Sequence, residues 1–198
     1  MSKEILKLKS GLRRPLSEAA RGLTAAERDQ DSQQLCRRLR GQDFWQRATT
    51  VLFYAPMPTE PDVWPLVQEA LAEGKQVALP RYMASQGEYE ARRVTDLDAD
   101  VHRGQFGIRE PDDRCPVVDL NRLDFVLVPG LGFDASGWRL GRGKGYYDRL
   151  LAEVRGLKCG IAFDWQMVAE VPTEPHDVRL NCILTPTRCL VLSSPCRF

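Results

Sequence analysis

Glycines and cations alternate in residues 141–148, GRGKGYYD, and this mixture is typical of a loop that binds anions. Glycine has no Cβ atom, so its backbone can approach a phosphate closely and can adopt positive φ angles. Arg139, Arg142 and Lys144 bring three positive charges to the same short stretch. We therefore predict a site for a phosphate-bearing ligand, such as a nucleoside triphosphate. A flexible surface turn with solvated cations is the alternative.

This loop differs from the Walker A loop. The GxxxxGK[ST] spacing is absent, and Lys144 is followed by Gly145 where a Walker A loop has a hydroxyl residue that binds magnesium. Asp148 could take over that role, because a carboxylate one turn into the following helix can hold a hydrated magnesium ion. Tyr146 and Tyr147 favour an ordered loop, with their rings either in the core or stacked on a ligand ring.

The elements around the loop indicate a parallel sheet. An apolar run at 124–129 predicts a buried strand before the loop, 144–154 predicts a helix after it, and 158–163 predicts another strand. Ligands of open parallel sheets lie beyond the carboxyl ends of the strands, where the next helix begins and its dipole attracts anions. The loop therefore occupies a position that suits a phosphate site.

A similar pattern precedes it in the chain. Two helices are predicted within 5–40, the second of them starting at Thr24 with a capping-box Glu27, and the first with Ile5, Leu8, Leu12 and Leu16 in helical spacing. A strand at 51–55, a helix at 63–73 and a strand at 76–80 form a further βαβ unit, and 83–119 reads as shorter strands and loops. The fold class is therefore α/β with a mostly parallel sheet.

Composition limits the class of protein. The 198 residues suit one domain, and a net charge of +1 argues against nucleic acid or anionic membranes as partners. No apolar run is long enough for a membrane span or a signal peptide, so a cytoplasmic protein is expected. Six cysteines without a CxxC pair and only two histidines argue against a zinc site. No long amphipathic seam is left over, which favours a monomer.

Residues 127–148, LVPGLGFDASGWRLGRGKGYYD, resemble the signature of the 5-formyltetrahydrofolate cyclo-ligase family. The resemblance extends in order over about residues 9–185. Its other parts are Lys9, Arg13, FYAPMPTEPD at 53–62, LPRY at 79–82, FGIREP at 106–111 and VPTEPHDVRLN at 171–181.

The resemblance implies an ATP- and magnesium-dependent closure of 5-formyltetrahydrofolate to 5,10-methenyltetrahydrofolate, with release of ADP and phosphate. ATP would phosphorylate the formyl oxygen, and the neighbouring folate nitrogen would then displace the phosphate. The implied fold is a three-layer α/β/α domain spanning 1–198, similar to sugar-phosphate isomerases and CoA transferases.

The resemblance also implies roles for single residues. The catalytic set would be Lys144, Arg142 and Tyr146, with the two cations stabilising the transferring phosphoryl group. Asp148 and Asp177 would bind magnesium. The implied folate site consists of Tyr54, Glu60, Phe106 and Tyr146. The implied ATP site consists of Lys9, Arg13, Arg139, Leu140, Gly141, Arg142, Gly143, Lys144, Gly145, Tyr146 and Tyr147.

Three positions depart from the family pattern. Asn181 stands where many relatives carry Asp, and Pro61 and Val63 replace more usual residues after Glu60. His176 could orient the neighbouring Asp177, or could be a surface histidine. The expectation is therefore that any carboxylate role at position 181 is lost or taken over by Asp177, and that the pterin pocket has an altered shape.

Two other functions stay open at this point. A sugar-phosphate isomerase or CoA-transferase relative would share the fold, although its expected catalytic acid or thioester-forming glutamate is not identifiable. An RNA-binding module could use the cations around 139–144 for phosphate groups, but it would need an extended basic stripe, which the near-neutral charge disfavours.

Overall fold

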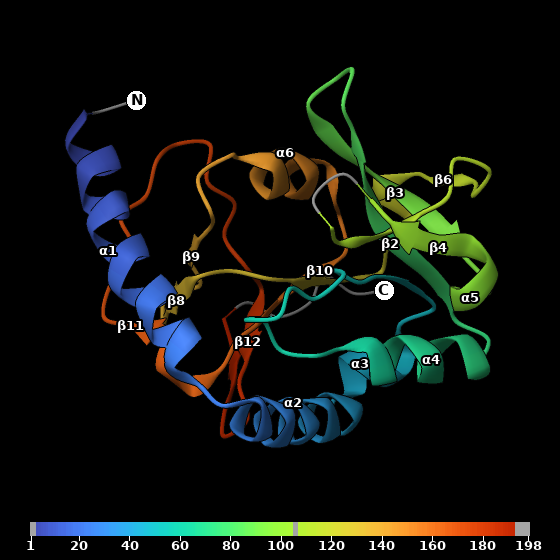
Figure 1. The fold of residues 1–198 in the computed structure, drawn as a ribbon, viewed down its shortest axis with the longest axis horizontal. Helices are drawn as coiled ribbons and strands as arrows, with labels where there is room; N and C mark the ends of the chain where they lie inside the picture. Colours follow the sequence, from blue (N-terminus) through green and yellow to red (C-terminus); the bar gives the residue numbers. More distant parts are fainter. Residues whose placement is uncertain (1–2, 105–106, 193–198) are drawn as a thin grey trace.

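An eight-stranded sheet runs through the centre of the computed structural model, which describes residues 3–104 and 107–192 (Figure 1). The strand order is β13-β12-β10-β7-β1-β2-β3-β6. Pairing is parallel from β12 through β2 and antiparallel at both edges, which confirms a mostly parallel sheet. The strands are β1 Thr50–Leu52, β2 Gln76–Met83, β3 Glu88–Val94, β6 Val117–Val118, β7 Phe125–Val128, β10 Leu157–Ile161, β12 Cys182–Leu184 and β13 Cys189–Val191.

Helices cover both faces of this sheet. The helices α2 (Ala25–Arg40), α3 (Asp43–Arg47) and α4 (Trp64–Ala72) lie on one face, and α6 (Tyr146–Glu153) lies on the other (Figure 1). Because strand side chains alternate between faces, neighbouring residues of one strand enter different cores. In β7, Phe125 and Leu127 pack toward α2–α4, whereas Val126 and Val128 pack toward α6. The three-layer α/β/α arrangement is thereby confirmed.

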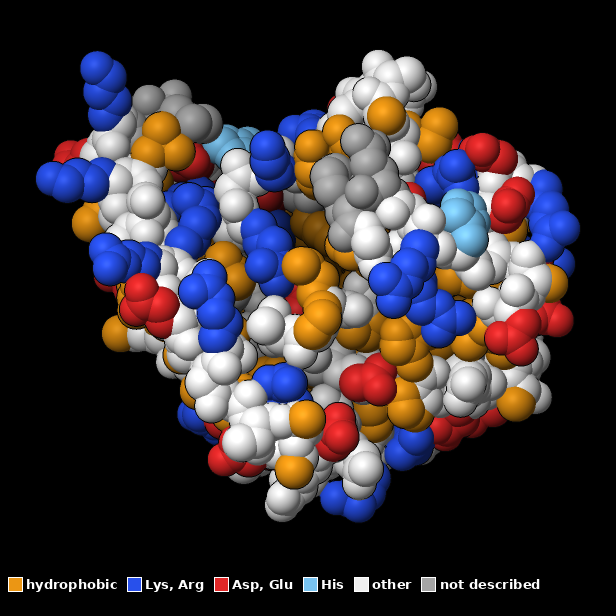
Figure 2. Space-filling view, viewed as in Figure 1, with side chains coloured by type: hydrophobic (Ala, Val, Ile, Leu, Met, Phe, Trp, Pro, Cys, Tyr) orange, Lys and Arg blue, Asp and Glu red, His pale blue; other side chains and the backbone are white. Residues whose placement is uncertain are grey.

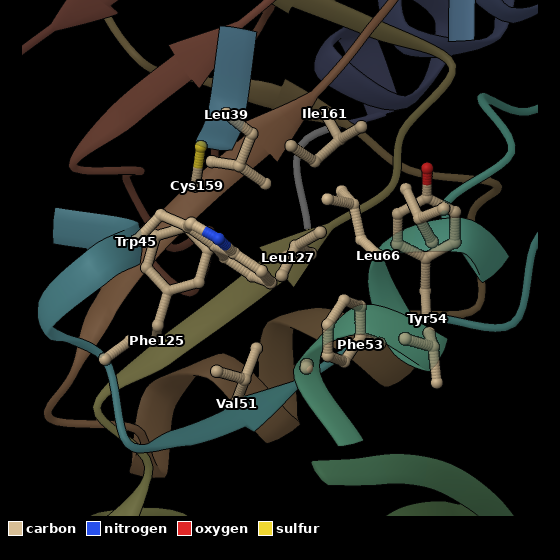
Figure 3. Close-up of a cluster of buried hydrophobic side chains, with 14 of the residues drawn as sticks. Leu39, Trp45, Val51, Phe53, Tyr54, Leu66, Phe125, Leu127, Cys159 and Ile161 are labelled. Atoms are coloured by element: carbon tan, nitrogen blue, oxygen red, sulfur yellow. The ribbon is translucent and has the colours of Figure 1, made fainter. Parts of the chain in front are cut away.

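The core beneath α2–α4 is the larger one and is shown in Figure 3. Trp45 of α3 lies edge-on to the rings of Phe53 and Phe125, with ring centroids 5.9 and 6.0 Å apart. All three side chains are almost fully buried. Truncating a buried aromatic residue such as Trp45 to alanine typically costs about 3–5 kcal/mol of stability. This core fixes the strands whose carboxyl ends carry the site.

The first helix, α1 (Lys3–Gly22), stands beside a small second sheet at one end of the molecule (Figure 1). That sheet has the order β11-β8-β9, with β8 Gly132–Asp134, β9 Arg139–Leu140 and β11 Met167–Val168. Leu16 packs there with Leu140, whereas Leu8 is 53% exposed. The apolar positions of α1 therefore do not form one buried stripe, since its buried apolar residues, Leu16 and Ala20, lie in the second half and the buried residue of the first half is Lys9.

Most predicted elements are confirmed, including the Thr24–Glu27 capping box of α2. The predicted strand at 51–55 is too long, because the ladder ends at Leu52 and the chain then turns so that the Tyr54 hydroxyl donates to the Pro61 carbonyl. The predicted helix at 144–154 begins later, at Tyr146, because Gly145 has the left-handed φ of 67°.

The polar region 83–119 contains short elements, as predicted. A hairpin of β4 (Val101–Arg103) and β5 (Arg109–Pro111) follows α5 (Leu97–Asp100) and packs against β2. Short 3-10 turns lie at Leu120–Arg122 and Asp164–Gln166. Within the described residues, no helix has the length and apolar character needed to cross a membrane.

Candidate active site

A cavity of about 1240 Å³ lies beyond the carboxyl ends of β1 and β7. Its walls come from α1, the segment 139–149, the strands β2, β3 and β5, and residues 174–178. Figure 2 shows Lys and Arg side chains gathered over α1 and the adjoining segment, beside a hollow that contains hydrophobic side chains. The expected position at the carboxyl ends of parallel strands is therefore where the cavity lies.

The structure brings together all predicted site residues that it describes. Lys9, Arg13, Tyr54, Glu60, Asp148, Asp177 and the whole segment 139–147 line this one cavity. Phe106 lies outside the described residues. The lining shows proximity, and the role of each residue in binding or catalysis stays a prediction.

The glycine-rich segment has the backbone that its sequence predicts. Gly143 and Gly145 adopt φ angles of 97° and 67°, which side-chain-bearing residues rarely adopt. Gly145 is the N-cap of α6 and provides no capping side chain, so the first amides of the helix are not satisfied by a cap. Arg13 of α1 fixes the segment by donating from Nε to the Gly141 carbonyl over 2.9 Å. The segment is therefore an ordered loop, and its binding of an anion stays a prediction.

The cations of this segment differ in what they contact. Arg139 is buried and donates from Nη2 to Asp148 Oδ1 at 2.7 Å. Arg142 is half-exposed and forms an ion pair with Glu60 at 3.0 Å. Lys144 is exposed and has no ion pair or hydrogen bond with any residue in the described ranges. Lys144 is thus the cation in the loop that is most available to a ligand.

Lys9 is a buried cation held between two acids. Its Nζ lies 2.6 Å from Asp177 Oδ2 and 3.1 Å from Glu174 Oε2. The same Asp177 oxygen accepts the Glu174 backbone N–H at 2.7 Å. Contacts of 3.9 Å join His176 to both acids. Lys9 therefore offsets one of the two negative charges of the segment 174–177.

The predicted magnesium ligands, Asp148 and Asp177, both face the cavity, and each is paired with a cation. Within residues 3–104 and 107–192, no group of three or more metal-binding side chains is found. One feature does suit a hard cation. Glu174 Oε1 is buried and has no hydrogen-bond partner in the described part of the chain. A buried oxygen atom without a hydrogen-bond partner in the described chain therefore lies in the acid pair that Glu174 forms with Asp177 around Lys9.

Tyrosines form the wall opposite α1. The rings of Tyr82, Tyr89 and Tyr146 lie with centroids 5.3 to 5.6 Å apart. The hydroxyls of Tyr82 and Tyr146 are 3.2 Å apart, and this hydrogen bond raises the pKa of Tyr82. Burial raises the pKa of Tyr89 to about 12. We refer to Tyr82, Tyr89 and Tyr146 as the aromatic wall, and the raised pKa values of Tyr82 and Tyr89 keep these two phenols neutral at physiological pH.

Tyr54 and Tyr147 are held more deeply than the aromatic wall. Burial raises the pKa of both phenols. The Tyr54 hydroxyl already donates to Pro61, and the Tyr147 ring packs against both cores with the Arg139 guanidinium 5.6 Å from its centroid. Both tyrosines line the cavity while also belonging to the framework that positions it.

The departures from the family pattern have local explanations. Asn181 accepts the Lys158 N–H at 2.9 Å, at the start of β12, and is not among the cavity-lining residues that the structure describes. Pro61 supplies the carbonyl that binds Tyr54. Val63 is buried in the core as the N-cap of α4. The altered residues therefore support the framework.

Several cavity residues were not assigned a role from the sequence, namely Tyr82, Tyr89, Glu110 and Glu174. Tyr82, Glu110 and Glu174 lie inside the segments 79–82, 106–111 and 171–181 that resemble the family, and this resemblance was the signal that could have identified them. Spacing could not identify them, because a lone Tyr or Glu in a loop or strand is compatible with many environments.

Comparison with known proteins gives a consistent result. The sequence model of the 5-formyltetrahydrofolate cyclo-ligase family matches residues 6–186. The chain is 34% identical to a 5-formyltetrahydrofolate cyclo-ligase of Mycolicibacterium smegmatis, covering 92% of this chain and 96% of that protein. It is 30% identical to one of Mus musculus, covering 89% and 92%. The structure is similar to that of Aquifex aeolicus 5,10-methenyltetrahydrofolate synthetase, with a TM-score of 0.85, 34% identity and 96% coverage of both chains.

Proposed function

The chain belongs to the 5-formyltetrahydrofolate cyclo-ligase family, and on this premise we propose that it closes 5-formyltetrahydrofolate to 5,10-methenyltetrahydrofolate with conversion of ATP to ADP and phosphate. One observation supports the proposal most strongly: the glycine-rich loop 141–145 and the aromatic wall line the same cavity. Tyr146 of the aromatic wall directly follows this loop. A phosphoryl donor and a flat heterocycle can therefore bind next to each other.

In the proposed reaction, the formyl oxygen of the folate attacks the γ-phosphorus of ATP, and ADP leaves. The neighbouring folate nitrogen then attacks the activated carbon, forms the new C–N bond and loses its proton. The C–O bond breaks and the former formyl oxygen leaves with inorganic phosphate. Negative charge changes most on the transferring phosphoryl oxygens, so fixed cations there stabilise the transition state.

The phosphate groups would bind to the loop 141–145. Lys144 is exposed and has no partner in the described chain, so it can contact a phosphoryl oxygen without first breaking an ion pair. Arg142 also reaches the cavity, but it must leave Glu60 or share itself between Glu60 and the ligand. Arg13 and Arg139 support the loop through the Gly141 carbonyl and Asp148.

The folate ring would lie against the aromatic wall. Tyr146 connects that wall to the phosphate loop, since it is the first residue of α6 and follows Gly145 directly. Tyr54 and Glu60 line the same cavity. Glu60 is held from both sides, by the Met57 N–H at 3.0 Å and by Arg142, which orients its carboxylate.

We also propose that magnesium acts with ATP in this site, where it would neutralise phosphate charge. Asp148 and Asp177 would hold it through carboxylate oxygens, the ligand type that a hard cation prefers, and the buried Oε1 of Glu174 is without a hydrogen-bond partner in the described chain. The ion pairs of Asp148 with Arg139 and of Asp177 with Lys9 keep both carboxylates oriented before a ligand enters.

The remaining parts of the proposal concern the whole molecule. We infer one catalytic domain over 1–198 that acts as a monomer in the cytoplasm, with ATP and the folate as its binding partners and no role for nucleic acid or membranes. Size-exclusion chromatography with light scattering tests the monomer directly.

The test of the function is the growth of 5,10-methenyltetrahydrofolate absorbance from 5-formyltetrahydrofolate, with ADP measured in the same samples. We expect equal amounts of both products, and none when ATP or magnesium is omitted. The Lys7→Ala variant is a suitable control, because Lys7 is exposed on α1 and does not line the cavity. Folded protein that binds ATP but forms no methenyl product contradicts the proposal.

A further inference from the structure

Glu110 is a buried acid of the cavity without a role in the proposed reaction. It lies in β5, is 5% exposed and lines the cavity together with Tyr82 and Tyr89. It also lines a smaller adjoining cavity of about 620 Å³ with Arg81 and Tyr82. Its carboxylate therefore stands where the aromatic wall meets the outer strands.

Glu110 differs in its partners from the other acids of the cavity. Each of the other acids forms an ion pair: Glu60 with Arg142, Asp148 with Arg139, and Glu174 and Asp177 with Lys9. Within the described residues, Glu110 forms no ion pair, and Arg81 and His102 act on it only at longer range. Glu110 is thus the acid of this cavity whose charge is not compensated by a neighbouring side chain.

The chain makes room for this carboxylate. A Cβ atom on Gly104 would lie 2.3 Å from both Cδ and Oε2 of Glu110, so a larger residue there would displace this carboxylate. The backbone N–H of Tyr82 donates a hydrogen bond to Glu110. The backbone of β2 therefore holds the Glu110 side chain on the cavity wall, where the carboxylate occupies the space beside Gly104.

A held, uncompensated carboxylate favours a ligand that donates hydrogen bonds. Burial raises the pKa of Glu110, which means that its charged form is poorly solvated there. A donor on a bound ligand would restore part of the lost solvation. The reduced pterin ring carries amide, amine and ring N–H donors, and both oxygens of Glu60 are already engaged by Arg142 and Met57.

We propose that Glu110 is a further folate-binding residue, whose carboxylate accepts a hydrogen bond from an N–H donor of the reduced pterin ring. The proposal rests on the proposed function for the identity of the ligand. It places an acceptor on the side of Tyr89 that faces β5, in addition to Glu60.

The test compares Glu110→Leu with Glu110→Gln, which keeps a carbonyl acceptor of similar size. We expect Leu to weaken 5-formyltetrahydrofolate binding about tenfold or more, as measured by calorimetry without ATP, and to raise its KM similarly. The KM for ATP and the melting temperature should stay close to wild type. Gln should restore most of the folate affinity. Asp98→Asn serves as a control, because Asp98 is an exposed acid of α5 outside both cavities.

Three results overturn the inference. Unchanged folate affinity in Glu110→Leu removes Glu110 from binding. A joint loss of folate affinity, ATP affinity and thermal stability shows that the residue is only structural. Lost kcat in Glu110→Gln with unchanged folate affinity assigns it to proton transfer instead. Calorimetry keeps the test separate from turnover, so wild type that binds the folate but forms no product would contradict the proposed function alone.

Discussion

The two sides of the cavity are built from different interactions. The side formed by α1, 139–145 and 174–177, called here the phosphate side, is held by ion pairs between residues far apart in the chain, such as Lys9 with Asp177 and Arg142 with Glu60. The aromatic wall is held by ring packing and by one hydroxyl pair. A charged ligand therefore meets groups that, apart from Lys144, already have partners, whereas a flat ligand meets a preformed surface.

This difference indicates how each side can fail. Removing one member of a buried ion pair leaves the other charged and poorly solvated, so substitutions on the phosphate side should affect folding as well as activity. Substitutions of hydroxyls in the aromatic wall remove only a weak contact and leave the rings packed. Lys144 is the exception on the phosphate side, because it is exposed and should affect activity alone.

The largest effect is expected for Lys9→Ala, which leaves Glu174 and Asp177 buried without their cation. The free energy of unfolding should fall by about 3–5 kcal/mol, measured by urea denaturation. The exposed Lys7→Ala on the same helix should change it by less than about 0.5 kcal/mol. The triple variant Lys9→Met, Glu174→Gln and Asp177→Asn should recover much of the stability, because no buried charge is left unpaired. Equal stability of Lys9→Ala and wild type would show that the phosphate side does not depend on this ion pair.

Lys144→Ala should separate activity from stability. Loss of a charge-assisted contact to the transferring phosphoryl group should raise the activation free energy by about 3 kcal/mol, roughly a hundredfold in kcat/KM. The unfolding free energy should not change, because Lys144 has no partner in the described chain. Steady-state kinetics measure kcat/KM, and Lys144→Arg, which keeps the positive charge, should recover part of it. Unchanged turnover would remove Lys144 from the mechanism.

Asp148→Asn tests the metal assignment. The magnesium concentration for half-maximal activity should rise by at least about tenfold, since even indirect contacts to a metal are worth that much. Folate affinity should change little. Magnesium titrations at saturating folate measure the first quantity and calorimetry measures the second. A collapse of folate affinity with an unmoved metal titration would show that Asp148 does not bind the metal.

The smallest effect is expected for Tyr146→Phe, which removes the hydroxyl contact to Tyr82 and keeps the ring. A neutral hydrogen bond contributes about 0.5–1.5 kcal/mol, so the KM for folate should rise about two- to tenfold. Tyr82→Phe should have a similar effect if the pair acts through this contact. A loss of kcat as large as that of Lys144→Ala would instead place the Tyr146 hydroxyl in the chemical step.

Local signals in the sequence were sufficient for much of the fold. The capping box at Thr24, the apolar run of β7 and the glycines before α6 each specify an element over a few residues, and the structure has these elements at or near the predicted positions. The strands β12 and β13 were not predicted as such, because short strands are defined by their partners in the sheet.

The partners of the site residues could not be predicted in the same way. Lys9 was expected to contact phosphate, yet it is paired with acids about 165 and 168 positions further along the chain. Arg142 and Glu60 were assigned to different substrates and contact each other across 82 positions. Spacing identifies which side chains face the same way on one element, but contacts between elements depend on how they pack.

On the proposed function, the ion pair between Arg142 and Glu60 would make the binding of the two substrates thermodynamically interdependent. A phosphate that draws Arg142 away leaves Glu60 with an oxygen free for the pterin, and a pterin donor that occupies Glu60 releases Arg142 for the phosphate. Linkage requires both effects to have the same size, so the factor by which ATP changes folate affinity must equal the factor by which folate changes ATP affinity. With these assignments, a single contact of 3.0 Å would favour the ternary complex over either substrate bound alone.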